Sequence, residues 1–180
     1  MTHLPHVILV DEQDHPIGTM EKMEAHERGV LHRAFSVFIL NEHQEMLLQQ
    51  RAPLKYHSGG LWTNACCSHP LPGESVEAAA HRRLSEELGI DCYLTSLFAF
   101  QYRTAFDNGL TEHEYDHVLL GQYDGPLLPD ASEVADYRYL SLPEIDQLLN
   151  TMPQAFTSWF HLAYPLLKKH LATPVPVNAD

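Results

Sequence analysis

Residues 73–90 read GESVEAAAHRRLSEELGI, and this stretch predicts the clearest helix of the chain, from Ser75 to Leu88. Gly89 follows the helix, where a left-handed C-terminal cap is expected. Apolar side chains recur every four residues along one stripe of the helix, and these are Val76, Ala80, Leu84 and Leu88. Such a stripe is typical of a helix that packs on a larger core.

The same helix carries two arginine–glutamate pairs spaced by four residues, Arg82 with Glu86 and Arg83 with Glu87. Residues four apart share a helix face, and each such pair contributes only a few tenths of a kcal/mol to stability. Taken alone, the two pairs indicate a solvated helix face.

Strands and helices alternate on both sides of this helix. We expect strands at residues 6–10, 34–40, 45–50, 93–103, 115–123 and 137–140, with a turn at 14–18, a hairpin turn at 41–44 and a loop at 51–60. Helices are expected at 143–150 and 154–171, the second kinked or broken at Pro165. This order predicts an α/β protein, an α+β sandwich in which a mixed β-sheet is flanked by helices, with a flexible tail at 173–180.

The composition excludes several classes of protein. At 180 residues the chain is long enough to bury one sizeable core, so we expect a single domain over 1–180. With 11 Lys and Arg against 24 Asp and Glu, the formal net charge is −13, which argues against binding of nucleic acid. An anionic substrate would need metal ions and a few placed cations to reverse this field locally.

The cysteine count and the apolar stretches indicate a cytoplasmic location. Three cysteines do not make a disulfide framework, and the first residues lack the basic and apolar regions of a signal peptide. The longest apolar stretches are of strand length, too short to span a bilayer. We therefore expect a soluble protein without a membrane partner.

The segment Trp62–Pro70 reads WTNACCSHP and places the thiol of Cys67 two residues from the imidazole of His69. A thiol, a histidine and an acidic helix within one supersecondary unit are components of a reaction centre. Cys66 and Cys92, by contrast, are expected to be small buried hydrophobic residues.

Histidines and carboxylates with metal-ligand character are scattered along the chain. Glu112 and Glu114 lie two apart on a predicted strand edge, so both face the same side. Together with His26, His32 and His69 they would suit Mn²⁺, Zn²⁺ or Fe²⁺. Because the chain has thirteen histidines, residue type alone decides nothing. His113 and His117 stay open, and surface positions are expected for His3, His43, His57, His161 and His170.

The helix and its lead-in follow a longer pattern of Gly73-Glu74, Arg82, Leu84 and Glu86-Glu87-Leu88-Gly89-Ile90. This pattern resembles the Nudix box, whose glutamates hold divalent cations against a diphosphate. Two positions depart from it, because Ser68 replaces the opening glycine and Arg83 replaces the acidic residue expected after the arginine. Nudix hydrolases use that acidic residue as a metal ligand to activate water, so the resemblance implies the frame with weakened hydrolytic chemistry.

Further motifs extend from about His6 to Trp159. They are Glu21-Lys22-x-x-x-His26, Leu31-His32-x-Ala34-Phe35-Ser36, Gln50-Arg51-Ala52-x-x-Lys55, Trp62-Thr63-Asn64-x-x-Cys67-x-His69-Pro70, Tyr102-Arg103, Glu112-x-Glu114 and Ala155-Phe156-x-x-Trp159. Together they resemble the metal-dependent isopentenyl-diphosphate isomerases, the non-flavin class built on a Nudix fold. The resemblance implies a Nudix-like core over about residues 32–165 with N- and C-terminal additions.

The reaction implied by this resemblance is a 1,3-allylic proton shift that interconverts isopentenyl and dimethylallyl diphosphate through a tertiary carbocation. It implies two acid/base groups on opposite faces of the substrate, Cys67 and Glu114, the second working with Tyr102. Which of the two is the acid in the forward direction stays open. Trp159 would present its indole to the cation, although its spacing to Phe156 and Phe160 is also explained by helix packing.

The resemblance also implies the ligands of the site. Mn²⁺ or Zn²⁺ is expected at His26, His32, His69, Glu112 and Glu114, and Mg²⁺ is expected at Glu87, bridging the phosphates. Lys22, Arg51 and Lys55, with Ser68, are expected to bind the diphosphate, and Arg83 to support Glu87 or face phosphate. We expect a monomer that acts on a small diphosphate.

Two other classes of function share this frame. A Nudix hydrolase of an organic diphosphate is disfavoured by Arg83 and by the Cys67–His69 segment. A metal-stabilised binding module without turnover is disfavoured by the presence of Cys67, Tyr102 and Glu114. The fold alone does not separate the three classes, because function depends on the site.

Overall fold

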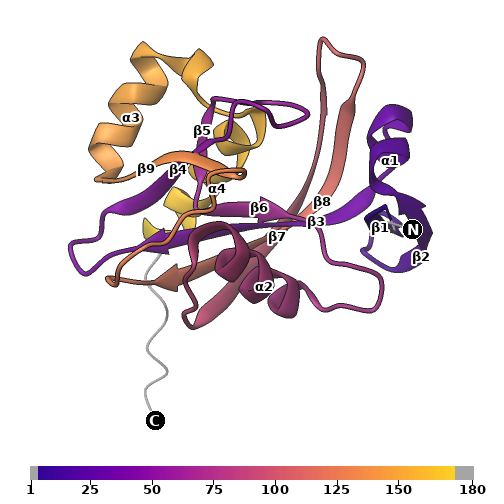
Figure 1. Ribbon diagram of the computed structural model, residues 1–180, viewed down its shortest axis with the longest axis horizontal. Helices are drawn as coiled ribbons and strands as arrows, with labels where there is room; N and C mark the ends of the chain where they lie inside the picture. The colour runs from indigo at the N-terminus through magenta and orange to yellow at the C-terminus, as the bar shows by residue number, and fades with distance from the viewer. Residues whose placement is uncertain (1–3, 173–180) are drawn as a thin grey trace.

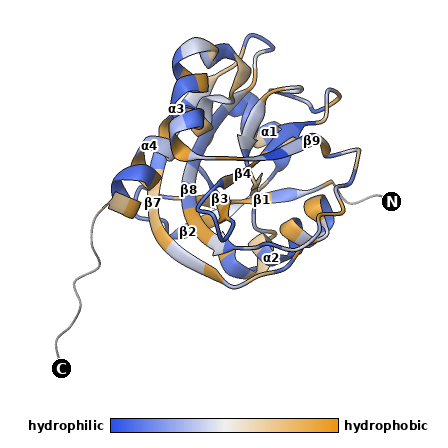
Figure 2. Ribbon diagram, turned by 90° about the vertical axis from the view of Figure 1, so that its left-hand side faces the viewer, coloured by the Kyte–Doolittle hydropathy of each residue, from blue (hydrophilic) through white to orange (hydrophobic). Residues whose placement is uncertain are grey.

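The computed structural model describes residues 4–172, and the expected flexible tail at 173–180 lies outside them. The described residues form a nine-stranded mixed sheet with helices on both faces, as predicted (Figures 1 and 2). Its strands are β1 (His6–Val10), β2 (Pro16–Glu21), β3 (His32–Leu40), β4 (Met46–Arg51), β5 (Trp62–Asn64), β6 (Cys66–Ser68), β7 (Leu94–Ala105), β8 (Thr111–Gln122) and β9 (Val134–Leu140). The helices are α1 (Lys22–Arg28), α2 (Val76–Leu88), α3 (Leu142–Thr151), the 3₁₀ turn η1 (Pro153–Ala155) and α4 (Ser158–Ala172).

The central strand of the sheet is β3, which pairs antiparallel with β1, β4 and β6 and parallel with β8. Successive side chains of a strand point to opposite faces, so β3 contributes to two cores. Phe35, Val37 and Ile39 pack beneath α2, whereas Phe38 and Leu40 pack against α3 and α4. Figure 2 shows α2 on one side of the sheet and α3 and α4 on the other.

The helix α2 agrees with the prediction. Ser75 is its N-cap and accepts a hydrogen bond from the Ala78 N–H at 3.1 Å. Gly89 ends the helix in the left-handed region at φ 66°. Leu84 and Leu88 of the predicted stripe are fully buried against the sheet. Because this stripe is packed on the sheet, the direction of the charged side chains of the helix, among them Arg83 and Glu87, is fixed as well.

A long antiparallel hairpin of β7 and β8 runs beside β3 (Figure 1). The second strand of the hairpin, β8, begins earlier in the sequence than predicted, at Thr111. Glu112 and Glu114 therefore lie within the strand, on one face, and Tyr102 of β7 is paired with Glu114. The hairpin thus delivers a hydroxyl and two carboxylates to one place.

The segment at 16–28 and the helix α4 differ from the sequence-based expectation. Residues 16–28 form β2 and α1, although only a turn was predicted there. The side chains of β2, an edge strand, are largely exposed. It therefore lacks the alternation of apolar and polar residues by which a strand is predicted. The helix α4 runs without a break through Pro165, so the predicted break is wrong. Its buried residues Trp159, Phe160 and Leu167 lie on both sides of the proline, and their packing outweighs the lost hydrogen bond.

Within residues 4–172, no helix is both long and apolar enough to cross a lipid bilayer.

Candidate active site

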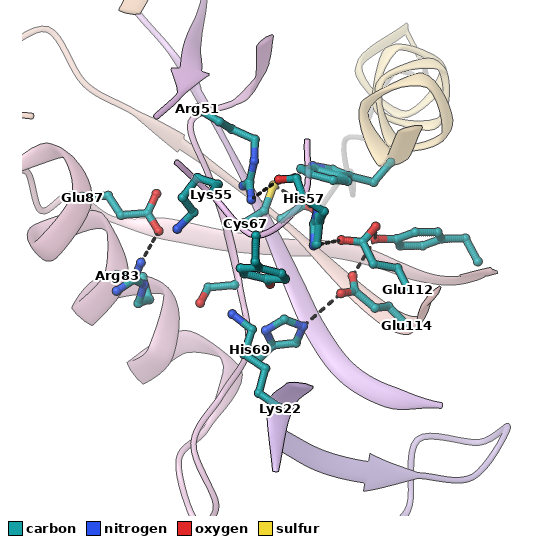
Figure 3. A pocket seen from close by; sticks show the side chains of 15 residues that line it. Lys22, Arg51, Lys55, His57, Cys67, His69, Arg83, Glu87, Glu112 and Glu114 are labelled. Carbon is teal, nitrogen blue, oxygen red and sulfur yellow. Dashed lines mark hydrogen bonds and ion pairs between the residues drawn. The ribbon is translucent and has the colours of Figure 1, made fainter. Parts of the chain in front are cut away.

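A pocket of about 450 Å³ opens where β3, β6, β8, α1, α2 and α4 meet (Figure 3). Its lining is strongly polar, in contrast to the two cores. The lining residues are Lys22, Ser36, Arg51, Lys55, Tyr56, His57, Cys67, Ser68, His69, Arg83, Glu87, Tyr102, Glu112, Glu114 and Trp159. All predicted site residues are among them except His26 and His32, which are fully buried beside His69.

Three imidazoles meet beneath one wall of the pocket. The ring N–H at Nδ1 of His26 donates to the Lys22 carbonyl at 2.7 Å, and that of His32 donates to the Val30 carbonyl at 2.8 Å. These bonds use Nδ1 of each ring and leave Nε2 as the atom that can face a metal ion. Nε2 of His32 lies 3.2 Å from Nε2 of His69, which lies 2.9 Å from Glu114 Oε1.

The donor atoms of His26, His32, His69 and Glu114 all lie within 4.8 Å of one another. Nε2 of His26 is buried and has no hydrogen-bond partner among the described residues. Burial lowers the pKa of His26 to about 4 and that of His69 to about 3, so both rings are neutral. Neutral imidazoles whose lone pairs converge beside a carboxylate fit a divalent transition-metal ion.

Tyr102 connects the two carboxylates of β8. Its hydroxyl lies 2.7 Å from Glu114 Oε2 and 3.1 Å from Glu112 Oε2, and donates to them. Burial, with the neighbouring Glu114, raises the pKa of Glu112 well above its usual value. Burial would also raise the pKa of Glu114, but its interactions with His32 and His69 outweigh burial and lower that pKa. The pair thus holds one protonatable and one ionised carboxyl group.

The thiol of Cys67 lies across the pocket, on β6. Adjacent strand residues point to opposite faces, so Cys66 is buried in the core beneath α2 while Cys67 faces the pocket. The Cys67 S–H donates to Asn64 Oδ1 at 2.9 Å, and the indole N–H of Trp159 donates to Sγ at 3.0 Å. Burial raises the pKa of Cys67 to about 12, so the group is a thiol in the free protein.

The orientation of Asn64 is fixed by its own hydrogen bonds. Its amide nitrogen donates to the carbonyl of Val37 at 3.0 Å and to that of Cys66 at 2.9 Å. Both amide protons are therefore used by the backbone, and the amide oxygen accepts from the Cys67 thiol and from the Thr63 hydroxyl, each at 2.9 Å. Asn64 was part of a predicted motif, but no role was predicted for it.

Four cations line the pocket, although the protein is acidic: Lys55 and Arg83 lie toward Glu87, Lys22 lies near His69, and Arg51 lies near Cys67 and His57 (Figure 3). Burial and the charges of Lys55, Arg51 and Arg83 lower the pKa of Lys22 to about 8. The guanidinium of Arg51 lies 5.1 Å from the centre of the Trp159 ring. Cations that destabilise one another in the free protein favour an anion between them.

The two helix ion pairs of the sequence analysis have different environments. Arg82 and Glu86 are partly exposed, as expected of a solvated face. Glu87, however, is 4% exposed, and its Oε1 accepts a hydrogen bond from Arg83 Nη2 at 2.6 Å. Arg83 also lies 3.3 Å from Glu133, which forms an ion pair with Lys55. The solvated-face interpretation is therefore wrong for Arg83 and Glu87, which line the pocket.

Comparison with known proteins identifies the family. The NUDIX domain profile matches residues 30–160. Isopentenyl-diphosphate Delta-isomerase of Pectobacterium atrosepticum is 54% identical over 161 residues, covering 89% of this chain and 90% of that protein. The protein of the same name from Burkholderia multivorans is 50% identical over 155 residues, covering 86% of this chain and 88% of that protein. The chain belongs to the isopentenyl-diphosphate Delta-isomerase family.

Solved structures show that this isomerase family member has the Nudix fold. DR0079 of Deinococcus radiodurans superposes with a TM-score of 0.70 at 18% identity, covering 89% of this chain and 98% of that one. The MutT protein of Methanosarcina mazei superposes with a TM-score of 0.64 at 17% identity, covering 79% and 96%. At such low identity the likeness concerns the fold alone, and it confirms the predicted Nudix-like sheet.

The histidine predictions for this isomerase family member need one correction. His57 was expected at the surface, but it is 6% exposed and its Nε2 lies 3.1 Å from Glu112 Oε1 in the pocket. A loop histidine is normally solvated, and the loop at 51–60 is instead folded into the site. His43 and His170 are exposed as expected, His161 is only half-buried, and His3 lies outside the described residues.

The two histidines that the sequence left open lie outside the pocket lining. Nδ1 of His113 lies 3.0 Å from the Gly29 carbonyl, and Nε2 of His117 lies 2.9 Å from Asp14 Oδ2. Residues 113 and 117 alternate with Glu112, Glu114 and Asp116 along β8, so they face the opposite side of the sheet.

A third carboxylate, Asp116, lies on the same face of β8 as the predicted pair. It is 1% exposed and accepts a hydrogen bond from Ser36 at 2.8 Å. Ser36 Oγ lies 3.7 Å from the sulfur of Cys67. The sequence analysis assigned neither residue to the site; the strand period, continued by two residues beyond Glu114, was the signal for Asp116.

Proposed function

We propose that this protein interconverts isopentenyl and dimethylallyl diphosphate, and that Cys67 and the Tyr102–Glu114 pair are its two acid/base groups. The observation that carries the proposal is their arrangement. A thiol on β6 and a hydroxyl–carboxylate pair on β7 and β8 line one pocket that is also lined by four cations. An allylic diphosphate needs these two environments side by side.

The chemistry follows from the alkene. A proton added to C4 of isopentenyl diphosphate leaves a tertiary cation at C3, and loss of a proton from C2 places the double bond between C2 and C3. One group therefore donates a proton and another accepts one, so the net charge of the substrate does not change. Each positioned group contributes on the order of 10²–10⁴-fold to the rate. In the reverse direction the two groups exchange roles.

Trp159 is proposed to stabilise the intermediate cation. Its ring lines the pocket, its N–H is held by the Cys67 sulfur at 3.0 Å, and it already lies beside one cation, that of Arg51. An indole face contributes roughly 0.5–2 kcal/mol to the binding of a cation and does not remove a proton from it. Packing in α4 and this role are compatible, since Trp159 is 3% exposed.

Two divalent ions are proposed for the active protein. His26, His32, His69, Glu112 and Glu114 would hold Mn²⁺ or Zn²⁺, which would order the carboxylates and lower the proton affinity of the groups near it. Glu87 would hold Mg²⁺, which would neutralise part of the diphosphate charge. Glu87 fits this role because it is a nearly buried carboxylate in the pocket wall, supported by Arg83 and Gln49.

The diphosphate is proposed to bind Lys22, Arg51 and Lys55, with Ser68 at the edge and Arg83 behind Glu87. These side chains come from α1, β4, the loop that follows β4, β6 and α2, and all of them line the pocket. Binding there directs the hydrocarbon toward Cys67 and Tyr102. We further propose that the protein acts as a cytoplasmic monomer with a single domain, which light scattering would test as a mass of 20.5 kDa.

The decisive test is incubation of isopentenyl diphosphate with the purified protein in D₂O with Mg²⁺ and Mn²⁺. We expect dimethylallyl diphosphate that carries deuterium, and we expect Cys67→Ala and Glu114→Gln to form none. The recovered substrate separates the roles, because a variant that keeps the acid but lacks the base exchanges protons at C4 without forming product. C4 exchange in Cys67→Ala alone identifies Cys67 as the base at C2, and exchange in Glu114→Gln alone identifies Cys67 as the acid.

Other outcomes would count against the proposal. Phosphate released from a nucleoside diphosphate, without isomerisation, would indicate a Nudix hydrolase. Tight binding of the diphosphate without any isotope exchange would indicate a binding module.

A further inference from the structure

We propose that His57 is a fourth imidazole ligand of the metal centre, beyond the five residues named above. The inference rests on the proposed function only for the presence of a divalent ion. His57 lies in the loop between β4 and β5, and its side chain is 3% exposed. No motif of the sequence assigned a role to it.

The first observation is an unpartnered nitrogen. Nε2 of His57 is buried and makes no hydrogen bond to any described residue. Nε2 of His26 is in the same state. Leaving a buried polar nitrogen without a partner costs roughly 1–3 kcal/mol, so two of them in one place point to a shared partner.

The second observation is the position of Glu112. Its Oε1 lies 3.1 Å from His57 Nε2 (Figure 3), yet the two atoms are not aligned as a hydrogen bond. Two atoms bound side by side to one ion, with bonds of about 2.1 Å, lie about 3 Å apart without pointing at one another. Nε2 of His32 and Nε2 of His69 have a similar separation, 3.2 Å.

The third observation is that His57 and the proposed metal ligands share His26. The donor atoms of His26, His57 and Glu112 lie within 4.8 Å of one another, as do those of His26, His32, His69 and Glu114. His26 belongs to both groups, and its Nδ1 is occupied by the Lys22 carbonyl. Nε2 of His26 has a single lone pair and binds one ion. The two groups of residues therefore share that ion, which gives one metal centre with six protein donors.

The ring of His57 is held in place for this role. It stacks on Phe106 with ring centres 4.7 Å apart, and Tyr56 packs edge-on at 4.3 Å. Ser58 Oγ lies 3.3 Å from Nδ1, within reach of an Nδ1–H, and the tautomer with that proton carries its lone pair at Nε2. Four imidazoles and two carboxylates favour Zn²⁺, Co²⁺ or Fe²⁺ over Mg²⁺, which prefers oxygen ligands.

The test replaces the metal by Co²⁺ and records the proton NMR spectrum of the full chain. Each coordinated imidazole contributes one exchangeable ring N–H resonance shifted far downfield by the paramagnetic ion. We expect four such resonances in the wild-type protein and three in His57→Gln, with Co²⁺ affinity about 10–100-fold weaker. His43→Gln, at an exposed histidine, is the matched control and should keep all four resonances.

Three resonances in the wild-type protein would overturn the proposal whatever the variants do. A count that is unchanged in His57→Gln would overturn it as well. If His57→Gln bound Co²⁺ with wild-type affinity, the proposal would also be overturned. His57 would then only donate a hydrogen bond to Glu112, which glutamine can do although it is a poor metal ligand. The measurement does not use turnover, so failure of the isomerase assay would be seen separately.

Discussion

The reactivity of Cys67 depends on a neighbour that does no chemistry itself. Asn64 is fully buried, and its amide protons are used by the carbonyls of Val37 and Cys66. Its oxygen therefore accepts the Cys67 S–H and sets the direction of that proton. A positioning residue of this kind acts on the rate through geometry, since a misplaced acid/base group transfers its proton poorly.

Replacement of Asn64 by alanine should therefore lower kcat by about 10–100-fold, the equivalent of losing one or two hydrogen bonds. KM should change little, because Asn64 is fully buried behind Cys67 and is not part of the pocket lining that would contact the diphosphate. Steady-state kinetics with isopentenyl diphosphate measures both constants. Asn41→Ala is the control, because Asn41 is a nearly buried amide in the β3–β4 turn; equal losses of kcat in both variants would show a general effect of lost stability.

At this scale the sequence predicts residue types better than contacts. The thiol, the imidazole of His69 and the carboxylate pair lie in short motifs, so their gathering in one pocket could be predicted. The role of Asn64 could not, because it depends on Val37, which lies 27 positions away on β3. His57 was misassigned because nothing in the sequence signals that a glycine-containing loop folds inward.

At the scale of elements, α2 is placed by its two ends as well as by its apolar stripe. Gly89 ends the helix at φ 66°, where residues with a side chain are strained. A Cβ at this position would also lie 2.8 Å from the Leu128 side chain and 3.1 Å from its carbonyl oxygen. The chain after α2 turns sharply here because only glycine meets both conditions.

The cost of the positive φ and the cost of the contact with Leu128 can be measured separately with two substitutions. Gly109 has φ 86° and nothing within 4 Å of its would-be Cβ, so Gly109→Ala should cost only the strain, about 1 kcal/mol of unfolding free energy. Gly89→Ala should cost about 1–3 kcal/mol more, because the backbone near Leu128 must move. Urea denaturation measures both values, and equal losses in the two variants would mean that the contact with Leu128 is relaxed without cost.

Elements with a strong apolar period were predictable, and those without one were not. The stripe of α2 and the β3–β4 hairpin have clear patterns, and both were located to within about two residues. The edge strand β2 is mostly exposed, and α1 has only seven residues, so neither has a period to detect. Pro165 predicted a kink or a break in α4, and the break is absent because the packing that offsets the local cost of proline is not visible in the sequence.

At the scale of the whole molecule, an acidic chain holds four cations around one space. The net charge of −13 repels an anion at long range, so attraction of the proposed diphosphate would come from the metal ions and from Lys22, Arg51, Lys55 and Arg83. Burial and the other three cations lower the pKa of Lys22 to about 8, so it loses its charge as the pH rises from 7 to 9. An anion bound there favours the charged form, so binding weakens over the same range.

The dissociation constant of inorganic pyrophosphate, measured by calorimetry at fixed Mg²⁺, should therefore rise several-fold between pH 7 and pH 9 beyond the change due to the ligand itself. Lys22→Arg keeps its charge over this range and should bind with a flatter pH dependence. The proton changes of pyrophosphate are common to both proteins and cancel in the ratio of the two constants. A ratio that does not vary with pH would show that Lys22 keeps its charge up to pH 9.

The parallel pairing of β3 with β8 has a consequence for how the protein is made. Ser36 on β3 and Asp116 on β8 lie 80 positions apart in the sequence, and His32 and Glu114 meet in the same register. Contacts between such distant segments form only after a large loop has closed, at a considerable entropic cost. During synthesis on the ribosome, the strand with Glu112 and Glu114 emerges long after the imidazoles that it joins. Capture of the proposed metal ion by the complete site would therefore be a late event that follows translation of most of the chain.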